Sequence, residues 1–186
     1  MFIAKQKKKE NIAEYLLYMW QLEDILRVYD LNIDRVYDCL VAPTNRSDEE
    51  KQEARYWYDN LITMMKLEGV QKEGHLQINT NLLADLNDFH LQLLRDPEES
   101  AYIATYYKTL SFIVELRAKS ENRDVPEMET CFTALYGYLL LKLQRKDVSG
   151  ETQAAVAQIS NLLRLLSEKY KLRDVKEEND FLNGIQ

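Results

Sequence analysis

Carboxylates at helical spacing are the residues of this sequence that could do chemistry most directly. Glu49, Glu50 and Glu53 stand close together, and Asp85 and Asp88 follow later with a spacing of three. Carboxylates three or four residues apart share one face of a helix, and magnesium takes oxygen ligands of this kind. One hypothesis is therefore a magnesium site made by Glu50, Glu53, Asp85 and Asp88.

The same segments resemble those with which all-helical nucleotide pyrophosphohydrolases hold magnesium, a Glu-Glu-x-x-Glu and a later Glu-x-x-Asp. Residues 49–53 match the first segment, and residues 85–88 match the second with Asp in place of Glu. However, Glu49 and Glu50 also fit the acidic first turn that many helices share, whereas the metal ligands of those enzymes lie mid-helix. A magnesium-dependent nucleotide pyrophosphohydrolase is therefore kept as the alternative function.

Other catalytic and metal-binding chemistry lacks the residues that it needs. His75 and His90 have no Glu three residues before them, so the Glu-x-x-His of di-iron bundles is missing. Cys39 and Cys131 share no ligand spacing, and no nucleophile or phosphate-loop motif occurs. The sequence therefore predicts no catalytic residue, no cofactor and no resident metal, with His90 expected as a hydrogen-bonded histidine at the edge of the core.

Three charged residues interrupt apolar helical stripes. Glu23 lies in the stripe of the first helix, and Arg117 and Lys142 lie in stripes of two later helices. A carboxylate on an apolar face is costly unless it is paired or hydrogen-bonded. We therefore expect Glu23 in a partly buried polar cluster with a cation or a tyrosine hydroxyl, and the forked guanidinium of Arg117 is the favoured partner over Lys142.

The elements that position these residues are helices, recognised by apolar residues at three- and four-residue spacing. The first is expected from about Lys7 to Tyr29, and Asn32 is expected to cap a short helix that ends near Val41. Ser47 with Glu50 forms a capping box, and Asp96-Pro97 is a further start signal.

The segment from Pro126 to about Gln144 is apolar nearly all round, which is typical of a helix at the centre of a bundle. Gly137 lies in its interior, where glycine costs about 1 kcal/mol against alanine. We therefore expect another helix to cross closely at Gly137.

Length and composition support a single all-α domain. The chain has 186 residues, of which 46% are apolar and only 5 are glycine and 3 proline, so it can bury a core but is poor in turns. We predict one domain over residues 1–186, a bundle of five long helices and one short helix. Residues 1–6 and 172–186 are expected to be frayed.

Charge and hydropathy limit the partners and the compartment. The first ten residues carry a net charge of +3 and the remaining residues a net charge of −10, which together give −7 for the whole chain. An acidic body is a poor partner for nucleic acid. No signal-peptide segment is visible and the longest uncharged runs have 12 residues, too short for a membrane span. We expect a cytoplasmic protein with no membrane partner.

The opening stretch carries a more specific pattern. Phe2-Ile3-Ala4-Lys5-Gln6-Lys7, Glu10 to Gln21 and Glu23-Asp24 resemble the N-terminal signature of a domain-of-unknown-function family of short, uncharacterised Bacteroidetes proteins. The resemblance implies a bacterial, cytoplasmic, helical protein, but it implies no activity and no functional residues.

These observations together favour a non-catalytic interaction or assembly protein. Its partner is expected to be another protein or a second copy of the chain, as in a homodimer.

Overall fold

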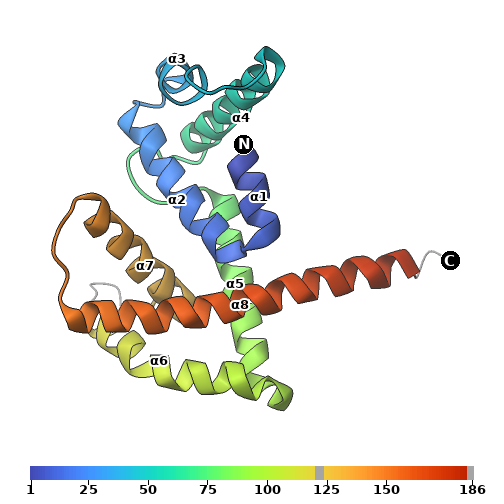
Figure 1. Cartoon of the computed structure of the whole chain (residues 1–186), viewed down its shortest axis with the longest axis vertical. Coiled ribbons are helices and arrows are strands. Elements are labelled where there is room, and N and C mark those ends of the chain that lie inside the picture. Colours follow the sequence, from blue (N-terminus) through green and yellow to red (C-terminus); the bar gives the residue numbers. More distant parts are fainter. Residues whose placement is uncertain (120–123, 184–186) are drawn as a thin grey trace. The chain divides into compact units, whose positions relative to one another are not determined.

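The computed structural model describes residues 1–119 and 124–183, and the side chains of residues 1–119 and 124–175. All regular structure in these residues is helical, which confirms the all-α prediction (Figure 1). The α-helices are α1 (Phe2–Glu10), α2 (Ile12–Val28), α3 (Ile33–Val36), α4 (Asp48–Leu67), α5 (Gln77–Arg95), α6 (Ser100–Lys119), α7 (Glu127–Leu143) and α8 (Gly150–Asn183). A π-helical turn, Tyr37–Val41, follows α3, and a 3-10 turn, Pro97–Glu99, precedes α6.

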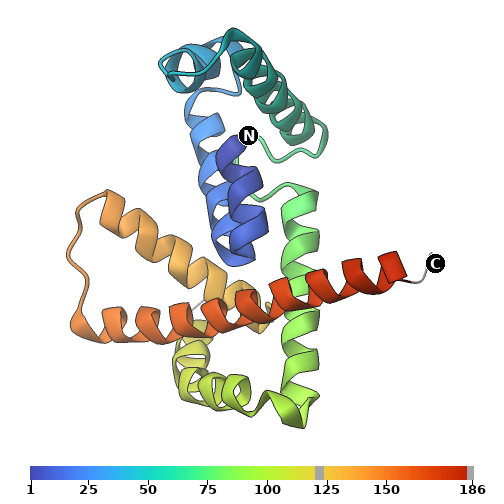
Figure 2. The ribbon, with the colours of Figure 1, turned by 45° about the vertical axis from the view of Figure 1, so that its right-hand side comes forward.

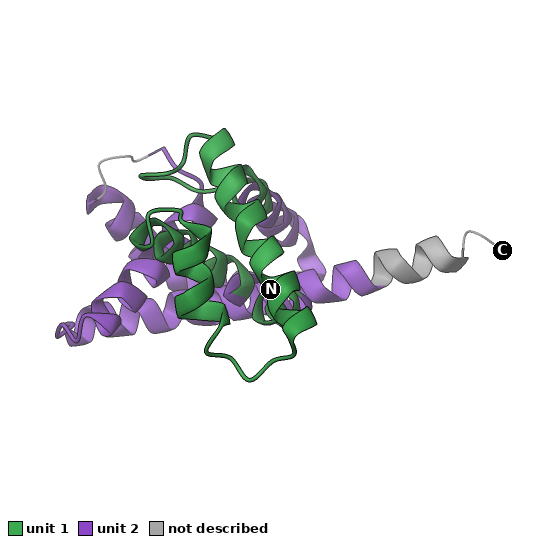
Figure 3. Ribbon diagram, turned by 90° about the horizontal axis from the view of Figure 1, so that it is seen from above, with its two compact units in different colours: residues 1–8, 15–82 green, residues 9–14, 83–186 purple. Residues whose placement is uncertain are grey.

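The contacts divide the chain into two compact units (Figure 3). Unit 1 comprises residues 1–8 and 15–82, and unit 2 comprises residues 9–14 and 83–186. In unit 1 the buried core includes Leu22, Leu26, Val36, Ile62 and Met65. In unit 2, α8 packs against α6 and α7 over a core that includes Leu86, Ile113, Phe132, Ile159, Leu162 and Leu166. That the chain folds as one domain stays a prediction.

The capping signals place several helix starts correctly. Asn32 accepts hydrogen bonds from the amides of Asp34 and Arg35 at the start of α3. Ser47 and Glu50 form both bonds of the capping box at the start of α4. Asp96 accepts from the Glu98 amide ahead of α6. These side chains satisfy amide donors that have no partner within the first turn of a helix.

The helix count differs from the prediction of five long helices and one short one. Six described helices have 17 residues or more, and two are short. The expected first helix is divided at Asn11, whose Oδ1 accepts from the amides of Ala13 and Glu14 and so starts α2 separately. Residues 2–6 belong to α1 and residues 172–183 to α8, while fraying of these ends stays a prediction.

Helix α7 does not have the central position expected from its apolar sequence. Its buried residues are Met128, Thr130, Cys131 and Phe132, all in its first half. Residues 134–141 are half-exposed, and Leu143 is 60% exposed. In both Figure 1 and Figure 2, α7 and α8 diverge toward the loop that joins them, so the second half of α7 stands away from α8.

The expected close crossing at Gly137 is also absent from the described part of the chain. A Cβ atom placed on Gly137 would meet no atom within 4 Å. No neighbour in the described structure therefore requires glycine at this position.

The structure also bears on membrane insertion. In the described ranges, no helix has the combination of length and apolar character that a membrane crossing requires.

Candidate functional site

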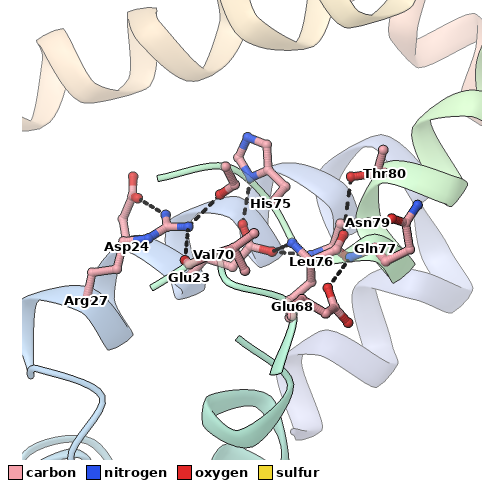
Figure 4. A network of polar contacts seen from close by, with 11 residues as sticks. Glu23, Asp24, Arg27, Glu68, Val70, His75, Leu76, Gln77, Asn79 and Thr80 are labelled. Carbon is pink, nitrogen blue, oxygen red and sulfur yellow. Dashed lines mark hydrogen bonds and ion pairs between the residues drawn. The ribbon is translucent and has the colours of Figure 1, made fainter. Parts of the chain in front are cut away.

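Glu23 is a buried carboxylate at the centre of a polar network in unit 1 (Figure 4). Only 1% of the residue is exposed. Its Oε1 accepts from the Leu76 amide at 3.0 Å and from Asn79 Nδ2 at 2.6 Å. Its Oε2 lies 2.6 Å from His75 Nδ1. The burial that the helical stripe predicts is therefore confirmed, and hydrogen bonds satisfy both carboxylate oxygens.

His75 is the aromatic partner of this carboxylate. An ionised Glu23 can only accept, so the contact places the proton of a neutral His75 on Nδ1. The imidazole stacks on the indole of Trp20, with 4.2 Å between ring centroids and 12° between the planes. Its side chain is 34% exposed. A carboxylate and an aromatic face therefore fix both the orientation and the tautomer of a histidine that reaches solvent.

Arg27, one turn after Glu23 on α2, holds the loop that carries His75. Its guanidinium donates to the carbonyl oxygens of Val70 at 3.1 Å and Gly74 at 2.5 Å, and to Asp24 at 2.7 Å. Gly74 has φ +83°, in the left-handed region that favours glycine. Residues of α2 therefore clamp the loop between α4 and α5 from both ends.

The sequence-based partners of Glu23 are corrected by these contacts. Glu23 pairs with His75 and Asn79, not with Arg117 or Lys142. Arg117 donates to the Val125 carbonyl, and its Nη1 lies 4.0 Å from Glu127. Lys142 is exposed and lies over the ring of Tyr138. Helical periodicity identifies which side chains point inward, but it does not say which loop packs against them.

A second buried polar network lies in unit 2, around His90. His90 is fully buried, so the expected position at the edge of the core is wrong, although its hydrogen bonding is confirmed. Its Nδ1 lies 2.7 Å from the Tyr102 hydroxyl and its Nε2 3.3 Å from Glu127 Oε2. Tyr106 donates to the other Glu127 oxygen at 3.2 Å. A neutral imidazole with its proton on Nε2 satisfies both of its contacts.

The electrostatics of this second network favour an ionised Glu127. The hydrogen bond from His90 lowers the pKa of Glu127, and it outweighs the opposing effect of burial. Burial, with the nearby Glu127 charge, raises the pKa of Tyr106 to about 12 and that of Cys131 to about 12. Cys131 is therefore an inert buried thiol in this structure.

The carboxylates of the magnesium hypothesis have other neighbours. Glu50 belongs to the capping box and also pairs with Arg46, while Glu53 and Asp88 are exposed. Asp85 accepts from Tyr170 at 2.5 Å and from Arg173 at 3.2 Å. Across the residues that the structure describes, no group of three or more His, Cys, Asp or Glu side chains is placed to hold a metal ion.

The Glu23 network can therefore orient an imidazole and hold a loop. Each of its hydrogen bonds joins α2 to residues 75–79 within unit 1, which is the geometry of a structural clamp. Sequence reasoning singled out Glu23 but missed His75, for which the only local signal is the Gly74 before it.

The comparisons with known proteins give a family and no activity. The family DUF4924, described as a domain of unknown function, matches residues 1–178. No curated protein and no solved structure matches the chain. The match confirms that the resemblance seen in the opening residues is to a domain-of-unknown-function family. It covers nearly the whole sequence, and the chain therefore belongs to the DUF4924 family.

Proposed function

We propose that this chain is a non-catalytic interaction or assembly protein that binds through the second half of α7. The contact surface, called here the α7 outer face, consists of Thr133, Ala134, Gly137, Leu140 and Leu141. These residues share one side of the helix, because they recur at spacings of three and four. They lie opposite the buried residues Met128, Cys131 and Phe132, while the buried Thr130, one turn before Ala134, lies on the same side as the face.

The observation that carries the proposal is the half-exposed state of an apolar helix. Residues 130–141 contain no charged side chain, and a helix that is apolar all round is normally buried. Here residues 134–141 remain half-exposed, with Leu143 exposed beyond them. A run of partly exposed apolar residues of this kind is typical of sites where a protein binds another.

The residues that flank this face suit a protein interface. Tyr136 and Tyr138 lie on either side of Gly137 and are both half-exposed. Tyrosine is enriched at protein interfaces because its ring supplies apolar area and its hydroxyl a hydrogen bond. We therefore infer a protein partner or a second copy, without a membrane or nucleic-acid partner.

The magnesium hydrolase gains no comparable support. Glu50 is used at a helix start and Asp85 pairs with Tyr170 and Arg173, so neither needs a metal to balance it. We also infer a bacterial, cytoplasmic protein of Bacteroidetes origin from the resemblance in residues 2–24; nothing in the fold carries that part of the proposal.

The test is binding by the purified chain with and without its apolar face. Wild-type protein is immobilised, and both an extract of the source organism and the purified chain itself are passed over it. The variant Leu140→Glu/Leu141→Glu places charges on the α7 outer face. Leu172→Glu on α8, where Leu172 is 64% exposed, is the matched control.

We expect the wild type and Leu172→Glu to retain the same protein, and the Leu140→Glu/Leu141→Glu variant to lose it. Circular dichroism must show equal helix content in all three proteins. Equal retention by the double variant would contradict the proposal, as would the absence of any retained protein, the chain itself included.

A further inference from the structure

No neighbour in the described structure packs closely enough against Gly137 to require a glycine there. It lies in the middle of α7, and a Cβ atom built there would meet nothing within 4 Å. Its φ is not in the left-handed region, so the backbone does not require glycine either. Because glycine destabilises a helix interior, the open space at Gly137 is suited to a backbone that approaches closely from outside the described chain.

The charges of α7 are separated along its axis. Glu127 and Glu129 lie in the first turn, and Lys142 lies in the last. Arg145 and Lys146 follow and are exposed. The uncharged residues 130–141 separate the two ends. The helix therefore has an acidic end, an apolar middle and a basic end.

Two copies of α7 have complementary charges when they lie antiparallel. Glu129 lies in the first turn of α7, and the exposed Arg145 and Lys146 lie just after its last turn. In two antiparallel helices that cross at Gly137, the acidic end of each α7 therefore lies near the basic end of the other. In a parallel pair the acidic ends would meet each other, as would the basic ends, and like charges repel.

We propose that a second copy of this chain docks on the α7 outer face, with the two α7 helices antiparallel and crossing at Gly137. This inference rests on the proposed function and names its partner. Leu140 and Leu141 of each copy cover Thr133 and Ala134 of the other, since these positions lie at equal distances from Gly137. The contact is two-fold symmetric, which is the commonest arrangement for a homodimer.

Disulfide cross-linking tests both the partner and the orientation. Exposed Cys39 is first replaced by Ser, while Cys131 is buried and stays. Gly137→Cys then places two thiols at the crossing point. Thr133→Cys is the matched control, because in the antiparallel pair its two copies are about 12 Å apart along the axis, eight residues at 1.5 Å each. A disulfide needs Cα atoms within about 7 Å.

We expect Gly137→Cys to form a cross-linked dimer on mild oxidation, and Thr133→Cys to remain a single chain. Equal cross-linking of both variants would mean parallel helices and would overturn the proposal. No cross-linking of Gly137→Cys together with none of Ala134→Cys/Leu140→Cys, whose two sites face each other three residues on either side of the crossing and leave Gly137 unchanged, would also overturn it. Since nothing lies within 4 Å of a Cβ at Gly137, neither result can be blamed on a disrupted fold.

Charge reversal supplies an independent test by sedimentation equilibrium. Glu129→Arg or Arg145→Glu alone should raise the dimer dissociation constant about tenfold, because the attraction between the acidic end of one α7 and the basic end of the other becomes a repulsion. The double variant should restore it to near the wild-type value. If the double variant dissociates as readily as the two single effects added together predict, the antiparallel pairing is contradicted.

The two proposals fail in different ways. If the wild-type chain stays monomeric but retains a different protein, and the Leu140→Glu/Leu141→Glu variant loses that protein, only the proposed self-association is overturned. If the Leu140→Glu/Leu141→Glu variant retains a partner as well as the wild type does, the proposed function itself is overturned.

Discussion

Glu23 illustrates what a single residue does in this molecule. Its carboxylate joins α2 to the Leu76 amide and the Asn79 side chain, both of which are buried. A buried hydrogen-bond donor that loses its acceptor destabilises the fold by its full desolvation free energy. The role of Glu23 should therefore be visible in stability.

Glu23→Ala should lower the free energy of unfolding by about 2–4 kcal/mol, because it leaves the donors of Leu76 and Asn79 unsatisfied. The measurement is urea unfolding followed by circular dichroism. Glu53→Ala, an exposed glutamate of α4 in the same unit, is the control and should change stability by less than about 0.5 kcal/mol. Equal effects of the two substitutions would refute the clamp.

Glu127 should make stability depend on pH. Its pKa is lowered in the folded state, first by the hydrogen bond from His90, so the folded protein binds fewer protons than the unfolded one. The resulting stabilisation is complete above the unfolded pKa of about 4.3 and is lost as pH falls through the folded value. Glu127→Gln should therefore flatten the acid limb of a plot of unfolding free energy against pH. An unchanged acid limb would mean that Glu127 is not held ionised by this network.

At this scale the sequence predicts which polar residues are inside, but not their partners. Glu23 is identified by its place in an apolar stripe. His75 is 52 positions away in the sequence, in a loop whose path depends on Arg27 binding two of its carbonyls. No local pattern encodes that contact.

At the scale of elements, local signals determine where helices begin. Ser47, Asn32 and Asp96 satisfy amides of their own first turns, so their effect can be read from neighbouring residues. Asn11 acts in the same way, but it is hidden inside a continuous apolar pattern. The position of α7 depends on distant helices, and its apolar composition alone placed it wrongly at the centre.

Two glycines should respond in opposite ways to alanine. Gly137→Ala should raise the free energy of unfolding of the monomer by about 0.5–1 kcal/mol, because alanine is the better helix former. Gly69→Ala should lower it by about 1 kcal/mol, because φ there is +74° and a side chain disfavours that region. Neither added Cβ meets an atom within 4 Å. Thermal unfolding of dilute protein measures both effects, and a destabilised Gly137→Ala monomer would show that a tight contact at Gly137 exists within the chain.

At the scale of the whole molecule, two compact units share one chain with no linker between them. Their boundary runs through α1, α2 and α5, because residues 9–14 and 83–95 group with unit 2. Composition predicts that a chain of this length can bury a core, but it cannot reveal a division that falls inside helices. The same limit explains why the exposed half of α7 becomes visible only in the folded structure.

The central claim is that the α7 outer face binds a second copy of the chain. The most direct measurement is the molar mass in solution by light scattering, over a range of micromolar concentrations. The wild type should approach twice the chain mass of 22.0 kDa, and Leu140→Glu should remain at the mass of one chain with the same circular dichroism spectrum. A wild type that stays at the mass of one chain throughout, or a Leu140→Glu variant that dimerises equally well, would contradict the account.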